Sequence, residues 1–83
     1  MRLQLVTNSG CVHCNQIKAT LEKIKPDYKE LVVEEISTTT EEGMKLVQQH
    51  GIMASPGVII EGKLAFTGGA SGSQLRKKLD EYR

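Results

Sequence analysis

The sequence predicts one α/β domain in which a four-stranded mixed sheet carries helices on both faces. The chain has 83 residues, which is the size of a single small domain. Apolar residues change between strand-like clusters and helical spacing, in the order strand, helix, strand, helix, strand, strand, helix. The strand–helix–strand start requires a crossover and favours parallel pairing, whereas the later hairpin adds antiparallel strands. Packing helices on both faces is the compact way to bury such a sheet.

The first predicted strand covers about residues 2–7. Its apolar side chains are Leu3, Leu5 and Val6. A turn at residues 8–10 follows, and from Cys11 the spacing of apolar residues becomes helical. Pro26 marks the end of this helix, because proline cannot continue the hydrogen-bond ladder. The apolar face of the helix consists of Cys14, Ile17, Leu21 and Ile24.

The second strand is predicted at residues 31–36, where Leu31-Val32-Val33 suggests burial on both faces, as in a parallel sheet. A second helix follows the threonine run, with Thr39 and Glu42 as its capping box. Gly51 is expected to end this helix in the left-handed conformation. Its apolar side is expected to consist of Met44, Leu46 and Val47.

A β-hairpin is predicted next, with strands at 58–60 and 64–66. Gly68-Gly69 then interrupts the chain. A last helix begins with a capping box formed by Ser71 and Gln74. Its apolar face consists of Leu75, Leu79 and Tyr82.

The charge balance excludes some classes of partner. Eleven basic and ten acidic residues leave a formal net charge of +1, so we expect no binding to nucleic acid and none to membranes. The apolar runs are too short to span a bilayer, and residues 1–7 lack the pattern of a secretory signal. We therefore expect a cytoplasmic protein. As a separate expectation, the domain is a monomer.

The two cysteines form the motif Cys11-Val12-His13-Cys14, at the predicted junction of the first strand and first helix. A bridge closing so short a loop stabilises a fold little, which favours a chemical role. Unpaired N–H groups and the dipole at a helix start stabilise a thiolate, the reactive form of cysteine. Cys11 is therefore expected to be the exposed nucleophile that forms a mixed disulfide with the substrate. Cys14, on the apolar helix face, is expected to be the buried resolving thiol.

With this motif at the first strand–helix junction, the chain resembles the thioredoxin/glutaredoxin superfamily. The resemblance is closest to the short glutaredoxin-like, or small thioredoxin, proteins of archaea and bacteria. Two further segments carry it: Ala54-Ser55-Pro56 directly before the third strand, and Gly68-Gly69 after the fourth. It implies the thioredoxin-like βαβαββα fold and a cis peptide bond before Pro56. It also implies substrate binding by Ser55, Pro56, Gly68 and Gly69.

The resemblance further implies a thiol–disulfide oxidoreductase. Such a domain works through its own Cys11–Cys14 disulfide and needs no bound cofactor and no metal. Its partners would be disulfide-containing proteins or glutathione disulfides, together with an upstream reductase that supplies electrons. The motif departs from the common ones, since Gly10 stands where thioredoxins carry Trp. Val12-His13 likewise replaces the Pro-Tyr of many glutaredoxins.

His13 is a candidate third catalytic residue. Cys-x-His-Cys resembles the motif of protein disulfide isomerases and bacterial disulfide oxidases. An imidazole beside Cys11 can donate a hydrogen bond or positive charge to the thiolate. Stabilising the reduced form makes the disulfide more oxidising. The alternative is a solvent-facing helix residue with little effect on the thiol.

Three other functions fit the same motif. A glutathione-linked glutaredoxin would use the same two cysteines. A metal-binding module would use Cys11, His13 and Cys14 as ligands for zinc or copper(I), or share the cysteines around an iron–sulfur cluster in a dimer. A redox-inert interaction domain would keep only the fold.

The remaining candidate residues have ordinary structural explanations. His50 lies in the last turn of the second helix, where a cation suits the helix dipole. Arg76-Lys77-Lys78 is expected on the solvated face of the final helix, and Glu34-Glu35 at the end of the second strand. Met44 and Met53 are expected to be core residues or residues at the rim of the site.

Overall fold

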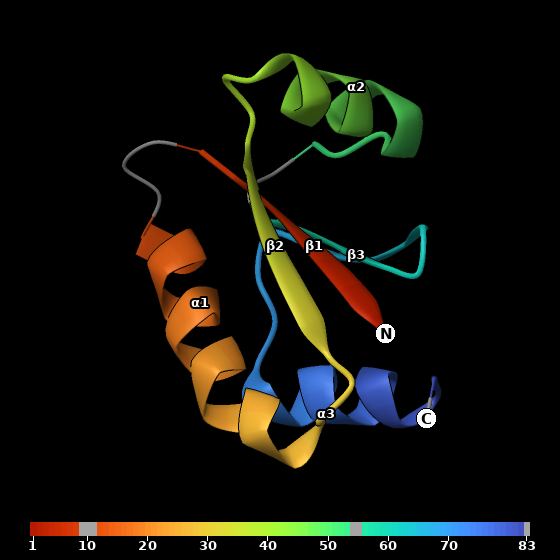
Figure 1. The fold of residues 1–83 in the computed structure, drawn as a ribbon. Helices are drawn as coiled ribbons and strands as arrows, with labels where there is room; N and C mark the ends of the chain where they lie inside the picture. The colour runs from red at the N-terminus through yellow and green to blue at the C-terminus, as the bar shows by residue number, and fades with distance from the viewer. Residues whose placement is uncertain (9–11, 54–55, 83) are drawn as a thin grey trace.

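A computed structural model of the chain describes residues 1–8, 12–53 and 56–82. Within these residues it contains three α-helices and four strands in the predicted order (Figure 1). The strands are β1 (Arg2–Thr7), β2 (Val32–Ser37), β3 (Gly57–Ile60) and β4 (Lys63–Thr67). The helices are α1 (Val12–Ile24), α2 (Glu41–His50) and α3 (Gly72–Asp80), and a short 3₁₀ helix, η1 (Lys25–Asp27), follows α1. The predicted βαβαββα order is therefore confirmed.

The sheet is mixed and has the strand order β2-β1-β3-β4. β1 and β2 are parallel, with Arg2 opposite Val32 and Thr7 opposite Ser37. β3 runs antiparallel to both β1 and β4, and Val6 near the end of β1 lies opposite Gly57 at the start of β3. The carboxyl ends of β1 and β2 and the start of β3 therefore meet at one end of the sheet.

The helices cover both faces of this sheet, as predicted (Figure 1). α1 and α3 pack on one face over the larger core cluster. The buried residues of this cluster are Leu3, Leu5, Ile17, Leu21, Ile24, Tyr28, Leu31, Val58, Ile60, Leu75 and Leu79. α2 covers the other face, where a smaller cluster holds it. That cluster consists of Val6, Ile52 and Ile59, with Leu46 and Val47 packed against them. Burial of these apolar surfaces is the main force that joins the two helical layers to the sheet.

The predicted burial of β2 on both faces is wrong. β2 is an edge strand, and the side chain of Val32 is 56% exposed. The strand that is buried throughout is β3, because it lies between β1 and β4 and is covered on both faces. Glu34 and Glu35 also lie inside β2 instead of at its end. An edge strand tolerates these carboxylates because water and basic neighbours reach them.

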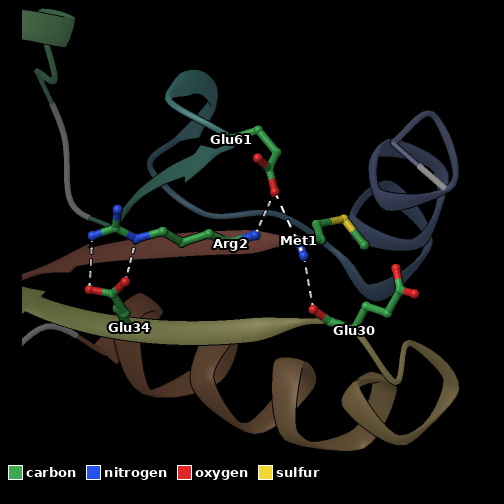
Figure 2. Close-up of polar contacts among 5 residues, drawn as sticks. All are labelled: Met1, Arg2, Glu30, Glu34 and Glu61. Carbon is green, nitrogen blue, oxygen red and sulfur yellow. Dashed lines mark hydrogen bonds and ion pairs between the residues drawn. The ribbon is translucent and has the colours of Figure 1, made fainter.

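Ion pairs and hydrogen bonds fix the beginning of β1 (Figure 2). The guanidinium of Arg2 binds Glu34 of the neighbouring strand, with Nη2 donating to Oε2 at 3.2 Å. This hydrogen bond, with the nearby negative charge, raises the pKa of Arg2 further above its usual high value. The backbone N–H of Arg2 donates to Oε1 of Glu61, at the β3–β4 turn, at 2.7 Å. The amino group of Met1 donates to the carbonyl oxygen of Glu30 at 2.9 Å. These contacts tie β1 to both of its neighbours at the end of the sheet away from the cysteine motif.

The start of α2 also differs from the prediction. Thr40, not Thr39, caps the helix, and its Oγ1 accepts a hydrogen bond from the backbone N–H of Gly43 at 3.0 Å. Thr39 instead shares a hydrogen bond with the hydroxyl of Ser37 at 2.8 Å. Because the cap is shifted by one residue, Gly43 and not Glu42 occupies the third helical position. Glycine has no side chain that could return a hydrogen bond to the backbone of the cap, so the reciprocal bond of a capping box is missing. Met44 is 53% exposed, and it is Leu46 and Val47 that face the core.

Several short-range predictions are confirmed. α1 ends at Ile24, and Pro26 lies in η1. Gly51 ends α2 in the left-handed conformation, with φ of 64°. Ser71 and Gln74 form both hydrogen bonds of the capping box of α3.

In the part of the chain described by the structure, no helix has the length and apolar character needed to cross a membrane.

Candidate active site

The cysteine motif lies where β1 leads into α1. α1 begins at Val12, so the motif occupies the strand–helix junction that the sequence predicts. Cys14 is 3% exposed and lies on the buried face of α1. The other buried residues of that face are Ile17, Leu21 and Ile24. The inward orientation expected for Cys14 is therefore observed, whereas Cys11 lies outside the described residues and its exposure stays a prediction.

His13 and Val12 lie on the outside of the same helical turn. Both are exposed, and Val12 has 66% of its surface accessible. The first turn of α1 therefore buries one sulfur and presents an imidazole and an apolar side chain to solvent. The influence of His13 on Cys11 stays a prediction.

Pro56 and the glycine pair are joined by a backbone hydrogen bond. The N–H of Gly68 donates to the carbonyl oxygen of Pro56 at 3.0 Å. Pro56 itself is fully buried, directly before β3. The predicted cis bond and the substrate contact of Ser55 both involve Ser55, which lies outside the described residues. The hydrogen bond between Gly68 and Pro56 nevertheless links two of the segments that carry the resemblance, although 12 positions separate these residues in the sequence.

The glycine pair also lies beside His13. Gly68 and Gly69 have φ of 79° and 118°, a region that side-chain-bearing residues rarely adopt. A Cβ on Gly69 would be 4.0 Å from the Cβ of His13. The two segments line a cavity of about 280 Å³. Its lining residues are His13, Gln16, Ile17, Gly68, Gly69, Ala70, Ser71 and Gln74. The fold thus brings together His13, Gly68, Gly69 and, through the hydrogen bond of Gly68, Pro56.

A second hollow lies on the α2 side of the same end of the sheet, and the sequence did not indicate it. It has a volume of about 320 Å³. Its lining residues are Asn8, Thr38, Met44, Val47, Gln48, Ile52 and Met53. Asn8 and Thr38 directly follow the parallel strands β1 and β2. Their positions in the sequence could have indicated this hollow, because ligands often bind at the carboxyl ends of parallel strands. We call this hollow the methionine groove.

The methionines at this groove are exposed. Met53 is 95% exposed and Met44 is 53% exposed, so the interpretation of either as a core residue is wrong. Met44 lies in α2, and Met53 lies between α2 and the segment before Pro56. Both are rim residues of the groove.

The described residues contain no cluster of three or more His, Cys, Asp or Glu side chains that could hold a metal ion. The metal site predicted from Cys11, His13 and Cys14 stays a prediction, because Cys11 lies outside the described residues.

Comparison with known proteins identifies the family. A model of the thioredoxin domain matches residues 1–80. The chain belongs to the thioredoxin domain family. The expected superfamily and the thioredoxin-like fold are thereby confirmed, and membership indicates thiol–disulfide oxidoreductase chemistry at the level of the family.

The relatives in sequence and structure agree with this family. Thioredoxin of Methanocaldococcus jannaschii is 28% identical over 75 residues, covering 90% of this chain and 87% of that protein. The structure of thioredoxin 1 from Thermosipho africanus superposes with a TM-score of 0.75 at 20% identity, covering 99% of this chain and 93% of that one. A malaria parasite thioredoxin-2, described as a component of the protein secretion machinery, gives a TM-score of 0.77 at 13% identity. This match covers 96% of this chain and 81% of that one. At these identities the two structural matches support the fold alone.

Proposed function

We propose that this thioredoxin-family domain exchanges a Cys11–Cys14 dithiol with the disulfide of a protein or small molecule. The observation that carries the proposal is the burial of Cys14, the second cysteine of the motif. Cys14 is buried on the inner face of α1, and Cys11 precedes the first residue of that helix. A thiol before a helix can reach an external disulfide, whereas a buried thiol one turn later is protected from substrates and suited to the second step.

The reaction has two displacement steps. The Cys11 thiolate attacks one sulfur of the substrate disulfide, and the other substrate sulfur leaves as a thiolate and takes up a proton. The Cys14 sulfur then loses its proton and attacks Sγ of Cys11, which releases the second substrate sulfur as a thiol. Two electrons and two protons pass to the substrate, and the domain is left with a Cys11–Cys14 disulfide. An upstream dithiol reductase returns it to the dithiol form.

Several further features complete the proposal. The domain works as a cytoplasmic monomer, with no bound cofactor and no metal. Ser55 and Pro56 bind the backbone of an extended substrate segment, an edge-strand type of recognition. His13 stabilises the Cys11 thiolate. Neither nucleic acid nor membranes are among the partners, in keeping with the nearly neutral charge.

A glutathione-linked activity is the second candidate, and one observation favours it. The cavity beside His13, Gly68 and Gly69 is adjacent to α1 and contains backbone that lacks side chains at two positions. A small peptide disulfide could approach that backbone closely. This candidate differs from the first in substrate and not in the roles of Cys11 and Cys14.

Trapping distinguishes the two candidates. Cys14→Ser removes the second displacement, so mixed disulfides should accumulate on Cys11 and can be identified by mass spectrometry. Captured proteins support the first candidate, and capture of glutathione alone supports the second. Cys14→Ala serves as a companion variant, because a hydroxyl at this buried position costs stability. The matched control is Cys11→Ser with Cys14 intact, which should capture nothing. Absence of adducts in both Cys14 variants, with their circular dichroism unchanged, would refute the nucleophilic role of Cys11.

A further inference from the structure

Thr7, the last residue of β1, carries a buried hydroxyl that the two displacement steps do not yet use. Thr7 is only 7% exposed. Within residues 1–8, 12–53 and 56–82, Tyr28 is the other buried residue with a hydroxyl, and that group donates to Asp80 at 2.8 Å. The hydroxyl of Thr7 forms no hydrogen bond with any described residue. Because burial of a polar group without a partner is costly, this threonine needs an explanation.

Thr7 lies on the face of the sheet that α1 covers. Leu5 of β1 packs in the larger core cluster with Ile17 of α1, whereas Val6 packs in the smaller cluster under α2. Successive side chains of a strand point to opposite faces, so Thr7 shares the face of Leu5.

Thr7 is also level with the first turn of α1. Leu5 lines one hollow together with Lys18 and Leu21, which shows where α1 crosses this part of β1. Thr7 lies two residues further along β1, a step of about 7 Å. α1 runs back along the parallel pair β1 and β2, and about 7 Å of helix is roughly four to five residues. The part of α1 level with Thr7 is therefore the turn that buries Cys14.

The same row of the sheet contains the proline of the proposed reaction site. Val6 lies opposite Gly57 in the antiparallel pair of β1 and β3. Continuing this register by one residue places Pro56 beside Thr7. Thr7 therefore occupies the central strand between the buried sulfur of Cys14 and the segment proposed to hold the substrate.

The charged groups of the surrounding elements lie elsewhere. His13 is exposed, and Nζ of Lys18 is paired with Oε2 of Glu35 at 2.8 Å. β3 contains no titratable residue, and the first turn of α3, residues 72–74, is uncharged. Arg2 of β1 and Arg76 of α3 are held in ion pairs toward the other end of the domain. No charged side chain is buried in the described part of the chain, so a hydroxyl is the polar group available to the buried sulfur.

We propose that the hydroxyl of Thr7 donates a hydrogen bond to the thiolate of Cys14 and so prepares it for the second displacement. The inference rests on the proposed function and deepens it, because it adds Thr7 as a positioning residue. A buried thiol in apolar surroundings ionises with difficulty, and a hydrogen bond to the charged form offsets that cost. The sulfur of Cys14 attacks Sγ of Cys11, the bond from Cys11 to the substrate breaks, and the leaving sulfur takes up the proton that Cys14 released. Thr7 keeps its own proton throughout.

Two-phase kinetics with 5,5′-dithiobis(2-nitrobenzoate) separate the two displacements. Equimolar reagent is mixed with the reduced protein, and the release of thionitrobenzoate is followed by absorbance. The first phase depends on concentration and reports attack by Cys11, whereas the second is independent of concentration and reports attack by Cys14. In Thr7→Val, which keeps the branched shape of the side chain, the second rate constant at neutral pH should fall about tenfold. The first should stay within about twofold of that of the parent.

Two companion variants test whether the hydroxyl itself is responsible. Thr7→Ser restores a hydroxyl, so its second rate constant should lie within about threefold of that of the parent. Thr20→Val is the matched control. The hydroxyl of Thr20 donates to the carbonyl oxygen of Gln16 at 2.9 Å, within α1 and away from the cysteines, so its removal should leave both phases within about twofold.

NMR tests the hydrogen bond without any reaction. Cys11→Ser leaves Cys14 as the only cysteine, and the resonance of its ¹³Cβ follows the ionisation of the thiol. In this background, Thr7→Val should move the ionisation of Cys14 to higher pH by about one unit, and Thr7→Ser by less than half as much.

The outcomes separate the inference from the proposed function. An unchanged second phase in Thr7→Val, equal slowing of both phases, or a loss that Thr7→Ser does not recover would overturn the inference. Ionisation of Cys14 at the same pH with and without the Thr7 hydroxyl would overturn it as well. Failure of the parent protein to release any thionitrobenzoate would instead refute the proposed function, and the NMR titration would still decide whether Thr7 stabilises the Cys14 thiolate.

Discussion

Replacing Gly43 by alanine should disrupt the docking of α2 on the sheet. Gly43 lies in the first turn of α2 and is the buried residue of this helix. A Cβ at this position would be 1.9 Å from the carbonyl oxygen of Ser37 and 3.0 Å from the Cα of Thr38. Both neighbours are backbone atoms, so no side-chain rotation can make room. The helix would have to move away from the turn that precedes it by more than 1 Å to reach an ordinary contact of about 3.5 Å.

The magnitude follows from three terms. Overpacking against a rigid neighbour costs up to about 3 kcal/mol. Displacing the helix start also weakens the hydrogen bond between Thr40 and the N–H of Gly43, a cap that is worth about 1 kcal/mol. Alanine returns about 1 kcal/mol of helix propensity relative to glycine. We expect a net loss of about 3 kcal/mol, which for a domain of this size lowers Tm by about 12 °C or more.

The matched control is Gly72→Ala in α3. Gly72 is the first residue of that helix, and its added Cβ would lie 3.4 Å from Cγ2 of Thr20, an ordinary van der Waals contact. Here the unfolded chain loses freedom and nothing clashes, so the variant should be more stable than the parent by about 0.5 kcal/mol. Urea denaturation followed by circular dichroism at 222 nm measures both variants, with all samples held in the same redox state. If Gly43→Ala unfolds within about 0.5 kcal/mol of the parent, the close approach of α2 to Ser37 is not what fixes this helix.

Two further predictions concern the cap of α2 and the cysteine motif. Thr40→Ala should cost about 1 kcal/mol of unfolding free energy, whereas Thr39→Ala should cost less than about 0.5 kcal/mol, as measured by urea denaturation. Equal losses of unfolding free energy in the two variants would contradict the assignment of Thr40 as the cap. His13→Ala should move the thiol titration of Cys11 to higher pH, because the imidazole would no longer stabilise the thiolate. It should also lower the reduction potential of the disulfide, measured by redox equilibration, and unchanged values would remove His13 from the mechanism.

Features that depend on nearby residues were predictable from the sequence. The buried face of α1 follows from the helical spacing of Cys14 and Ile17, and the capping box of α3 follows from Ser71 and Gln74. These interactions close within one or two helical turns, so the local sequence specifies them. The cysteine motif at a strand–helix junction could be recognised for the same reason.

Features that depend on the neighbours in space were not predictable. The apolar run Leu31-Val32-Val33 is typical of a central strand, but the sheet order places β2 at the edge and buries β3 instead. Which threonine caps α2 depends on how closely Gly43 approaches the turn after β2. The methionine groove likewise arises only when the ends of β1 and β2 meet α2.

The sequence by itself therefore determined the order of elements, the family and the two sulfurs that carry the proposed chemistry. Only the tertiary structure decided which surfaces flank them. It placed His13 beside Gly69 on the α1 side and left Met44 and Met53 exposed on the α2 side. The physical reason is that periodicity and capping act over a few residues, whereas burial is set by the packing of segments that lie tens of residues apart.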